Sequence, residues 1–332
     1  MSQYQLVDSI FSDDVAEEPT RAGFGRGLKA AGEANEAVVA LCADLTESTQ
    51  MHHFKAAFPT RFVEVGVAEQ NLVTVASGMA RAGKIPFTSS YAAFSPGRNW
   101  EQIRTTATLN DQPVKIVGSH AGVSVGPDGA THQMLEDIAL MRVLPNMVVV
   151  APGDSIEAEK ATRAIAENGK PSYIRLAREK TPIFSTDASP FELGKAYVLR
   201  EGHDVSLLGT GIMTYQLLVA AHELEKHHIS AEVVHVPTIK PLDEATILCS
   251  ITKTGRVVTA EEAQIAGGFG GAIAELLSER KPTPLKRIGM YDRFGESGQP
   301  NELLDHFGLT GHKMVPVIAR FIKETPQYHR EY

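Results

Sequence analysis

Short apolar runs alternate with segments of helical periodicity along the first half of the chain. The runs have the length and composition of buried strands. Strands are therefore expected at 37–43, 63–65, 85–88, 114–118, 147–150 and 173–176. Amphipathic stretches between them predict helices at 67–81, 100–109, 135–142 and 154–166. Gly83 is expected to close the first of these helices, and Asp154 to cap the last. Such alternation is typical of a parallel sheet covered by helices, an α/β fold.

Residues 179–192, EKTPIFSTDASPFE, interrupt this pattern. The segment contains two prolines and no periodicity, so we expect the chain to cross here between domains. With a boundary near Ser185, the predicted domains are 1–184 and 185–332. The alternation then restarts, with strands expected at 205–208, 232–236 and 256–260, and helices at 213–226, 243–251 and 271–279. The second domain is therefore predicted to be a smaller α/β unit.

Composition narrows the classes of function. The chain has 332 residues, 43% hydrophobic and 22% charged, which is typical of a folded protein of two domains. Its net charge of −8 argues against a nucleic-acid binder but leaves room for a local phosphate site. Cys42 and Cys249 form no disulfide framework or metal motif, which favours a reducing cytoplasm. Because no apolar run approaches membrane-spanning length and the N-terminus lacks a signal pattern, we expect no membrane association.

The densest polar segment is SHAGVSVGPDGATHQMLED, residues 119–137, which follows a predicted strand. Its glycines allow the backbone to fold so that His120, Asp128 and His132 could converge. Open parallel sheets bind ligands at the carboxyl ends of their strands, so these side chains are candidates for a site. Capping of a surface turn would explain them equally well, and spacing alone leaves both interpretations open. No metal site is predicted, because no short His/His or His/Glu helical spacing accompanies them.

Three further residues are candidates outside this segment: Glu69, Tyr91 and Phe94. Glu69 lies in the first turn of an otherwise apolar helix, where the helix dipole alone would favour an acid. Tyr91 and Phe94, in TSSYAAFSPGRNW, would ordinarily fill a core.

Two glycine-rich segments carry weaker signals. The partial G-x-G motif at 209–211 lacks its third glycine, and the GGFGG segment at 267–271 is more typical of a tight loop than of an anion site.

Taken together, five segments of the sequence resemble the transketolase family, specifically its pyrimidine-binding and C-terminal domains. They are ADLTES, VGVAEQN, FTSSYAAF, SHAGVSVGPDGATHQMLEDIALMRVLPNM and APGD, and their order and spacing match over essentially the whole chain. The length resembles the separately encoded C-terminal subunit of a split transketolase. The family's N-terminal diphosphate-binding domain, with its GDG-to-Asn magnesium motif, has no counterpart in this sequence. The resemblance therefore implies an N-terminal partner subunit that carries the diphosphate and Mg²⁺ site, and a homodimer of this chain within a heterotetramer.

The resemblance implies thiamine diphosphate as the cofactor. Glu69 corresponds to the glutamate that hydrogen-bonds the aminopyrimidine ring nitrogen, and Tyr91 and Phe94 to aromatic residues packed around that ring. Asp44, in ADLTES, corresponds to an aspartate near the cofactor. The segment FSPGRNW departs from the family stretch that supplies one more aromatic residue, so the third packing contact stays open.

The resemblance also implies a sugar phosphate site. His120 and His132 correspond to histidines that contact the sugar hydroxyls and relay protons, and Asp128 to the aspartate that holds the hydroxyl on the second carbon. Three residues correspond to the phosphate-binding positions: Arg21, Ser48 and Arg178. Arg175, in YIRLAREK, is an alternative to Arg178 as a phosphate ligand.

The function implied is transfer of a two-carbon ketol group from xylulose 5-phosphate to ribose 5-phosphate or erythrose 4-phosphate, in the pentose phosphate pathway. Within the same superfamily, 1-deoxy-D-xylulose-5-phosphate synthase and the β subunits of 2-oxoacid dehydrogenases are alternatives. His120 together with His132 favours ketol transfer. A subunit of a different class, which assembles the complex without chemistry, is the remaining alternative.

Overall fold

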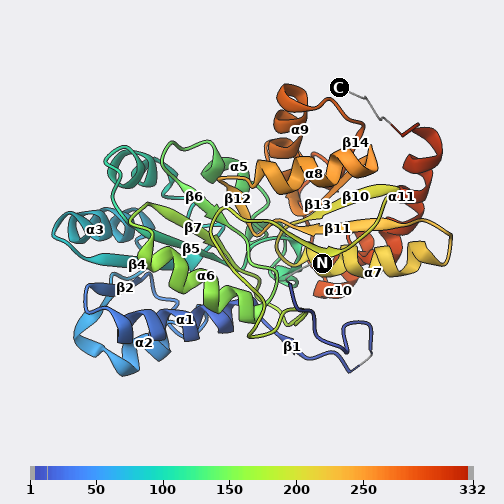
Figure 1. Cartoon of the computed structure of the whole chain (residues 1–332). Coiled ribbons are helices and arrows are strands. Elements are labelled where there is room, and N and C mark those ends of the chain that lie inside the picture. Colours follow the sequence, from blue (N-terminus) through green and yellow to red (C-terminus); the bar gives the residue numbers. More distant parts are fainter. Residues whose placement is uncertain (1–3, 13, 328–332) are drawn as a thin grey trace.

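The computed structural model describes residues 4–12 and 14–327, which form two α/β units around separate sheets (Figure 1). The first sheet has seven strands in the order β12-β6-β7-β5-β4-β2-β3. All neighbouring pairs are parallel except β12 and β6. The strands are β2 (Val38–Cys42), β3 (Phe62–Glu64), β4 (Ile85–Tyr91), β5 (Lys115–Ser119), β6 (Val148–Val150), β7 (Ser172–Arg175) and β12 (Thr238–Lys240). The α/β fold and the six strands predicted in this half are confirmed.

Helices cover both faces of the first sheet, because successive side chains of its strands point to opposite sides. In β2, Val38 and Ala40 pack with α1, α2 and α6, whereas Val39 and Leu41 pack with α3 and α5. These helices are α1 (Thr20–Ala34), α2 (His52–Ala57), α3 (Glu69–Arg81), α5 (Asp137–Arg142) and α6 (Ser155–Glu167).

Several local features differ from the prediction or were missed by it, including the helices α1 and α2. The single helix predicted at 100–109 is instead a short α4 (Trp100–Gln102) followed by a π-helical segment, Ile103–Thr108. Helix α1 was not predicted, because its glycines lower its helix propensity. One of them lets α1 approach α6 closely, since a Cβ atom on Gly23 would lie 1.8 Å from the Ser155 carbonyl oxygen. Tertiary packing therefore stabilises a helix that local propensity does not predict.

The second sheet has five strands in the order β14-β13-β10-β11-β9, of which β9 alone is antiparallel to its neighbour. They are β9 (Tyr197–Arg200), β10 (Val205–Gly209), β11 (Ala231–His235), β13 (Val257–Gln264) and β14 (Leu285–Met290). Helices α7 (Met213–Glu225) and α11 (Gly311–Glu324) pack on one face, and α8 (Glu244–Thr254) and α9 (Phe269–Arg280) on the other. The sequence pattern predicted three of these strands and missed β9, β14, α10 (Pro300–His306) and α11.

The two units are joined by both apolar and polar contacts. Strand β12 comes from the second half of the chain but completes the first sheet by pairing with β6. His235 of β11 is fully buried, and its Nε2 lies 2.7 Å from the Glu157 Oε2 of α6. We call the described residues before β1, 4–12 and 14–16, the N-terminal arm. In this arm Leu6 pairs with Ser185, and a short antiparallel ribbon of β1 (Glu17–Glu18) and β8 (Thr181–Pro182) follows it. Among the described residues, no helix is long and apolar enough to cross a membrane.

Candidate active site

The carboxyl ends of the parallel strands bring most of the predicted site residues to one edge of the first sheet. Ser48 follows β2, Tyr91 ends β4 and His120 follows β5. In the register of β4 and β5, Tyr91 lies opposite Ser119, so the next residue, His120, reaches the Tyr91 ring. The site is thus a direct consequence of strand direction and register.

Ser48, Tyr91 and His120 form the centre of this cluster. The Ser48 hydroxyl lies 2.7 Å from the Tyr91 hydroxyl and 3.4 Å from His120 Nε2. The rings of Tyr91 and His120 are stacked, with centroids 3.9 Å apart. Ser119 Oγ lies 2.8 Å from His120 Nδ1 and fixes the other side of the imidazole. His120 has a φ of 59°, an uncommon backbone conformation for a residue with a side chain.

Phe94 and His132 extend the cluster into an aromatic wall. Their ring centroids are 5.4 Å apart in an edge-to-face arrangement, and the Tyr91 and Phe94 centroids are 6.2 Å apart at a small interplanar angle. His132 follows a single turn of 3₁₀ helix, Gly129–Thr131, and Thr131 Oγ1 lies 2.9 Å from its Nδ1. Four flat side chains therefore pack together beside the sheet edge.

Burial and nearby cations keep the His120 imidazole neutral. Only 2% of the residue is exposed. Burial, followed by the positive charges of Arg21 and Arg178 and by His132, lowers the pKa of His120 from 6.5 to about 3. A neutral imidazole has one nitrogen that donates and one that accepts a hydrogen bond, so it can hold or release a proton without a change in the charge of the resting site.

Two arginines border the cluster. Arg21, at the start of α1, donates to the Ser48 carbonyl oxygen over 2.6 Å and to the Arg178 carbonyl oxygen over 3.0 Å. Burial lowers the pKa of Arg21 from its usual value. Arg178 follows β7, and its Nη1 lies 3.3 Å from Asp128 Oδ2. Asp128 therefore lies beside the arginines that border the cluster. Arg175, the alternative phosphate ligand, is 9% exposed, and its Nε lies 2.9 Å from Asp137 Oδ2 inside the protein.

Glu69 is a buried acid with a partner that the sequence did not reveal. It is 2% exposed, and its Oε2 lies 2.8 Å from Arg98 Nη1. Ser90 Oγ lies 3.5 Å from its Oε1, and Asn99 Nδ2 donates to its carbonyl oxygen over 2.9 Å. The Arg98 guanidinium also lies over the Phe94 ring, 4.7 Å from the centroid. The departure of FSPGRNW from the family stretch was the available signal for Arg98.

Asp44 lies apart from this set. It follows β2 with a φ of 60°, is exposed, and donates its backbone N–H to Glu64 Oε1 over 2.7 Å. Among the residues that the structure describes, Asp44 makes no hydrogen bond or ion pair with the other predicted site residues.

The side chains around Glu69 fit one end of thiamine diphosphate, its pyrimidine ring. A buried carboxyl group beside aromatic side chains can bind a ring nitrogen and the faces of a flat heterocycle. Within 4–12 and 14–327, no group of three or more His, Cys, Asp or Glu residues could hold a metal ion. The buried carboxyl group and the aromatic side chains therefore suit the pyrimidine ring of the cofactor.

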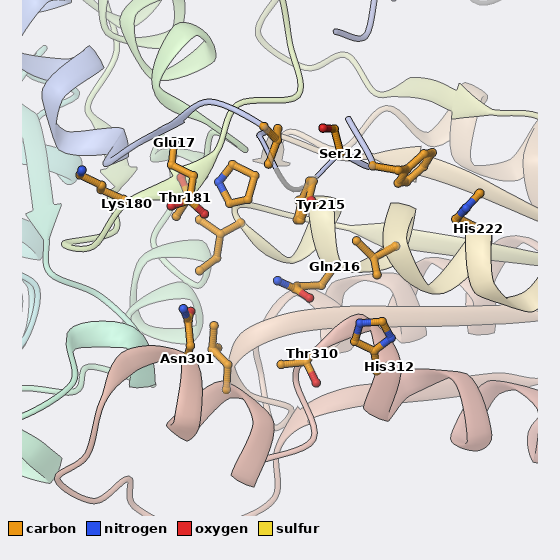
Figure 2. Close-up of a pocket in the computed structure, with 16 residues that line it drawn as sticks. Ser12, Glu17, Lys180, Thr181, Tyr215, Gln216, His222, Asn301, Thr310 and His312 are labelled. Atoms are coloured by element: carbon orange, nitrogen blue, oxygen red, sulfur yellow. The ribbon is translucent and has the colours of Figure 1, made fainter. Parts of the chain in front are cut away.

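A separate cleft of about 530 Å³ lies between the N-terminal arm, β8 and the helices α7 and α10 (Figure 2). Lys180 lies at one end of this cleft and His312 at the other. The predicted site residues are not among those that line it, so the cleft is distinct from the cluster at the sheet edge.

Comparison with known proteins agrees with this architecture. The family model described as "Transketolase, pyrimidine binding domain" matches residues 17–183, and "Transketolase, C-terminal domain" matches 194–314. The chain is 44% identical to a "Putative transketolase C-terminal section" of Methanocaldococcus jannaschii, over 92% of this chain and 96% of that protein. It is also 44% identical to a "6-deoxy-6-sulfo-D-fructose transketolase subunit" of a Clostridium species, over 85% of this chain and 87% of the relative. A solved structure titled "Split gene transketolase, inactive beta4 tetramer" has a TM-score of 0.86 and 43% identity, and covers 92% of this chain and 98% of its own.

The fold and the sheet-edge cluster define an enzyme-like α/β protein with a pyrimidine-binding domain followed by a second α/β domain. The chain belongs to the transketolase family. Membership supports a transferase in the broad sense and implies the use of thiamine diphosphate.

Proposed function

We propose that this chain is the C-terminal subunit of a thiamine diphosphate-dependent transketolase, which transfers a two-carbon ketol group between sugar phosphates. The observation that carries the proposal is the cluster at the edge of the first sheet. There a buried acid, Glu69, an aromatic pair and the histidines His120 and His132 lie beside two arginines. These groups match the three needs of the reaction, which are a cofactor ring, proton transfer and an anionic substrate.

Glu69 would hold the aminopyrimidine end of the cofactor. A carboxyl group at this secluded position can share a proton with a ring nitrogen, while Tyr91 and Phe94 pack on the ring and exclude water. When bound, thiamine diphosphate supplies the carbon centre that stabilises negative charge during carbon–carbon bond cleavage and formation. Arg98 would orient Glu69 through its ion pair and hold Phe94 in place.

His120 and His132 would handle the protons of the sugar hydroxyls. His120 Nδ1 is fixed by Ser119, which leaves Nε2 on the side of Ser48 and Tyr91. There it can accept a proton from one hydroxyl and return it later, as general acid–base catalysis requires. Asp128 would hold the hydroxyl on the second carbon, and Asp44 is proposed to lie near the cofactor.

Arg21, Arg178 and Ser48 would bind the anionic end of the substrate. Two guanidinium groups and a hydroxyl can donate several hydrogen bonds to the oxygens of a phosphate. Their positions explain how a chain of net charge −8 could bind an anion. A sulfonate has the same arrangement of three oxygens, and the Clostridium relative is named for a sulfonated fructose. A sulfosugar is therefore the second candidate substrate.

The proposed partner is an N-terminal subunit that carries the diphosphate and Mg²⁺ site, in a heterotetramer of two chains of each kind. Support comes from the solved relative, a split-gene transketolase whose title describes a tetramer of its β chain as inactive. The free thiols Cys42 and Cys249 support a reducing, cytoplasmic location.

The domain boundary is proposed to lie near Ser185. Family matches that end at 183 and begin again at 194 support this position.

A coupled assay tests this function. The chain is assayed alone and with a candidate N-terminal subunit, in the presence of thiamine diphosphate and Mg²⁺, with xylulose 5-phosphate and ribose 5-phosphate or erythrose 4-phosphate. Activity only in the mixture would support the proposal. Parallel reactions with 6-deoxy-6-sulfofructose and with pyruvate would reveal the sulfosugar and 2-oxoacid alternatives. Unchanged activity of a mixture containing E69Q would show that the chain only assembles the complex.

Substitution of the two histidines is the first residue-level test. H120A and H132A should each lower ketol transfer by about 100-fold or more, because each would remove a positioned proton-transfer group. H222A is the matched control, since His222 lies on α7 beside the separate cleft. Full activity of both H120A and H132A mixtures would contradict the proposed sugar site.

A further inference from the structure

The loop that carries His120 and His132 is held between the two units of the protein. It runs from the end of β5 to the start of α5 and includes a 3₁₀ turn at Val123–Val125. Gln133 Nε2 donates to the Val123 carbonyl oxygen within the loop over 3.1 Å and to the Glu296 carbonyl oxygen of the second unit over 2.9 Å. A second contact with that unit is made by Glu262 of β13. We call residues 120–136 the histidine loop.

Glu262 makes a close contact with the backbone of the histidine loop. It is 2% exposed, and its Oε1 accepts the backbone N–H of Ser124 over 2.5 Å. Gly122 has a φ of 87°, and a Cβ atom there would lie 2.3 Å from the Glu262 carboxyl carbon. Only a glycine combines this backbone conformation with this approach. The second carboxylate oxygen, Oε2, is buried and has no hydrogen-bond partner among the described residues.

Arg175 and Asp137 connect this contact to the far end of the histidine loop. Arg175 Nη1 lies 4.0 Å from Glu262 Oε2, and its Nη2 donates to the Glu262 carbonyl oxygen over 2.7 Å. Its Nε lies 2.9 Å from Asp137, the first residue of α5. Burial raises the pKa of Glu262 and opposes its ionisation, whereas Arg175 favours the charged form. Arg175 thus links Asp137, at the end of the loop, to Glu262 of β13, which in turn binds the backbone of Ser124.

We propose that Glu262 is a positioning residue, which holds the histidine loop in the geometry that His120 and His132 need for ketol transfer. The expected effect of Glu262 on catalysis rests on the proposed function. The contact itself does not: a carboxylate of the second α/β unit accepts a backbone N–H in the loop of the first unit. A displacement of about 1 Å in a catalytic group can cost about 100-fold in rate, so a contact of this kind bears on activity without touching substrate.

Glu261 provides a matched control on the same strand. It is also a fully buried acid of β13, but its carboxylate accepts the N–H groups of Phe269 and Gly270 at the start of α9. Burial raises the pKa of Glu261 to about 7. Its loss would disturb α9 and leave the contact between Glu262 and Ser124 in place.

The first readout is amide hydrogen exchange of the full chain without substrate. In E262A the Ser124 amide should exchange about 10- to 100-fold faster, because a buried donor loses its acceptor. E261A should accelerate Phe269 and Gly270 and leave Ser124 unchanged. E262Q keeps an acceptor oxygen and should restore most of the protection of Ser124. If E262A does not fold, E262D, which is one methylene shorter, should show the same acceleration at Ser124.

The second readout is steady-state kinetics of the complex with the partner subunit. E262A, or E262D in its place, should lower kcat and raise the sugar phosphate KM, with the affinity for thiamine diphosphate unchanged. E262Q should recover most of the loss, and E261A should resemble the wild type. Unchanged Ser124 exchange in the folded variant, or equal kinetic losses in E261A, would overturn the inference. Absence of ketol transfer by the wild-type complex would instead overturn the proposed function, while the exchange result would still decide whether Glu262 holds the loop.

Discussion

At the scale of single residues, the candidate site depends on buried polar groups that are each held by a specific partner. Glu69 is 2% exposed, whereas its partner Arg98 has 49% of its side chain exposed. An acid in such a place needs a counter-charge, because water cannot solvate it. Arg98 provides that charge and also packs on Phe94, so one side chain supports two parts of the proposed cofactor site.

This arrangement predicts a specific coupling between Glu69 and Arg98. R98Q should lower the free energy of unfolding by about 1–2 kcal/mol, less than for a fully buried pair because Arg98 is half exposed. E69Q removes the charge that needs compensation, so the double variant E69Q/R98Q should be more stable than R98Q alone. Urea unfolding of the four proteins measures the coupling. Additive effects would show that the ion pair does not stabilise the fold.

His120 predicts a dependence of stability on pH. Its pKa is about 3 in the folded protein and about 6.5 in an unfolded chain. Between these values the unfolded chain binds a proton that the native protein does not. The free energy of unfolding should therefore fall as the pH is lowered from about 6.5 towards 3, by at most about 1.4 kcal/mol per pH unit from this residue. Denaturant unfolding of wild type and H120N measures the difference, and equal slopes for the two proteins would contradict it.

At the scale of elements, the sequence pattern predicted the buried strands well, because apolar runs bounded by turns are a local signal. It missed elements that depend on distant contacts. Strand β12 has three residues and pairs with β6 of the other half, and α1 contains glycines that are explained only by its packing on α6. The resemblance supplied the candidate site residues, but not Arg98 or Glu262, whose partners lie 29 and 138 residues away in sequence.

The contact between α1 and α6 leads to a prediction about the position of Arg21. In G23A the new methyl group would lie 1.8 Å from the Ser155 carbonyl oxygen and force the helices apart. The variant should lose about 1–3 kcal/mol of stability and, in the complex, bind sugar phosphate more weakly. Gly271 of α9 is the control, because a Cβ atom there would meet its nearest neighbour at 3.9 Å. G271A should be neutral or stabilising in thermal unfolding. Equal losses in the two variants would argue against the close approach as the cause.

At the scale of the whole molecule, the two α/β units pack against each other through apolar and polar contacts. One apolar cluster contains buried residues of both sheets, including Leu41 of β2 and Val257 of β13. The buried pair of Glu157 and His235 and the contact of Glu262 with the histidine loop join the units through polar groups. The second unit therefore contributes to the geometry of the site, beyond any role in association between chains.

In the proposed complex, this chain binds the pyrimidine ring and the partner subunit binds the metal. This arrangement predicts how the protein responds to removal of metal. Since the described part of the chain has no group of three or more His, Cys, Asp or Glu residues that could hold a metal ion, EDTA should leave the thermal unfolding of the isolated chain unchanged. In the complex with the proposed N-terminal subunit, EDTA should abolish ketol transfer, and added Mg²⁺ should restore it, because the partner would hold the metal and the diphosphate. Differential scanning calorimetry of the chain and the coupled assay of the complex test the two parts separately. If EDTA lowers the unfolding temperature of the isolated chain, this subunit itself binds a structural metal. If the complex stays active in EDTA, ketol transfer does not depend on the proposed metal site.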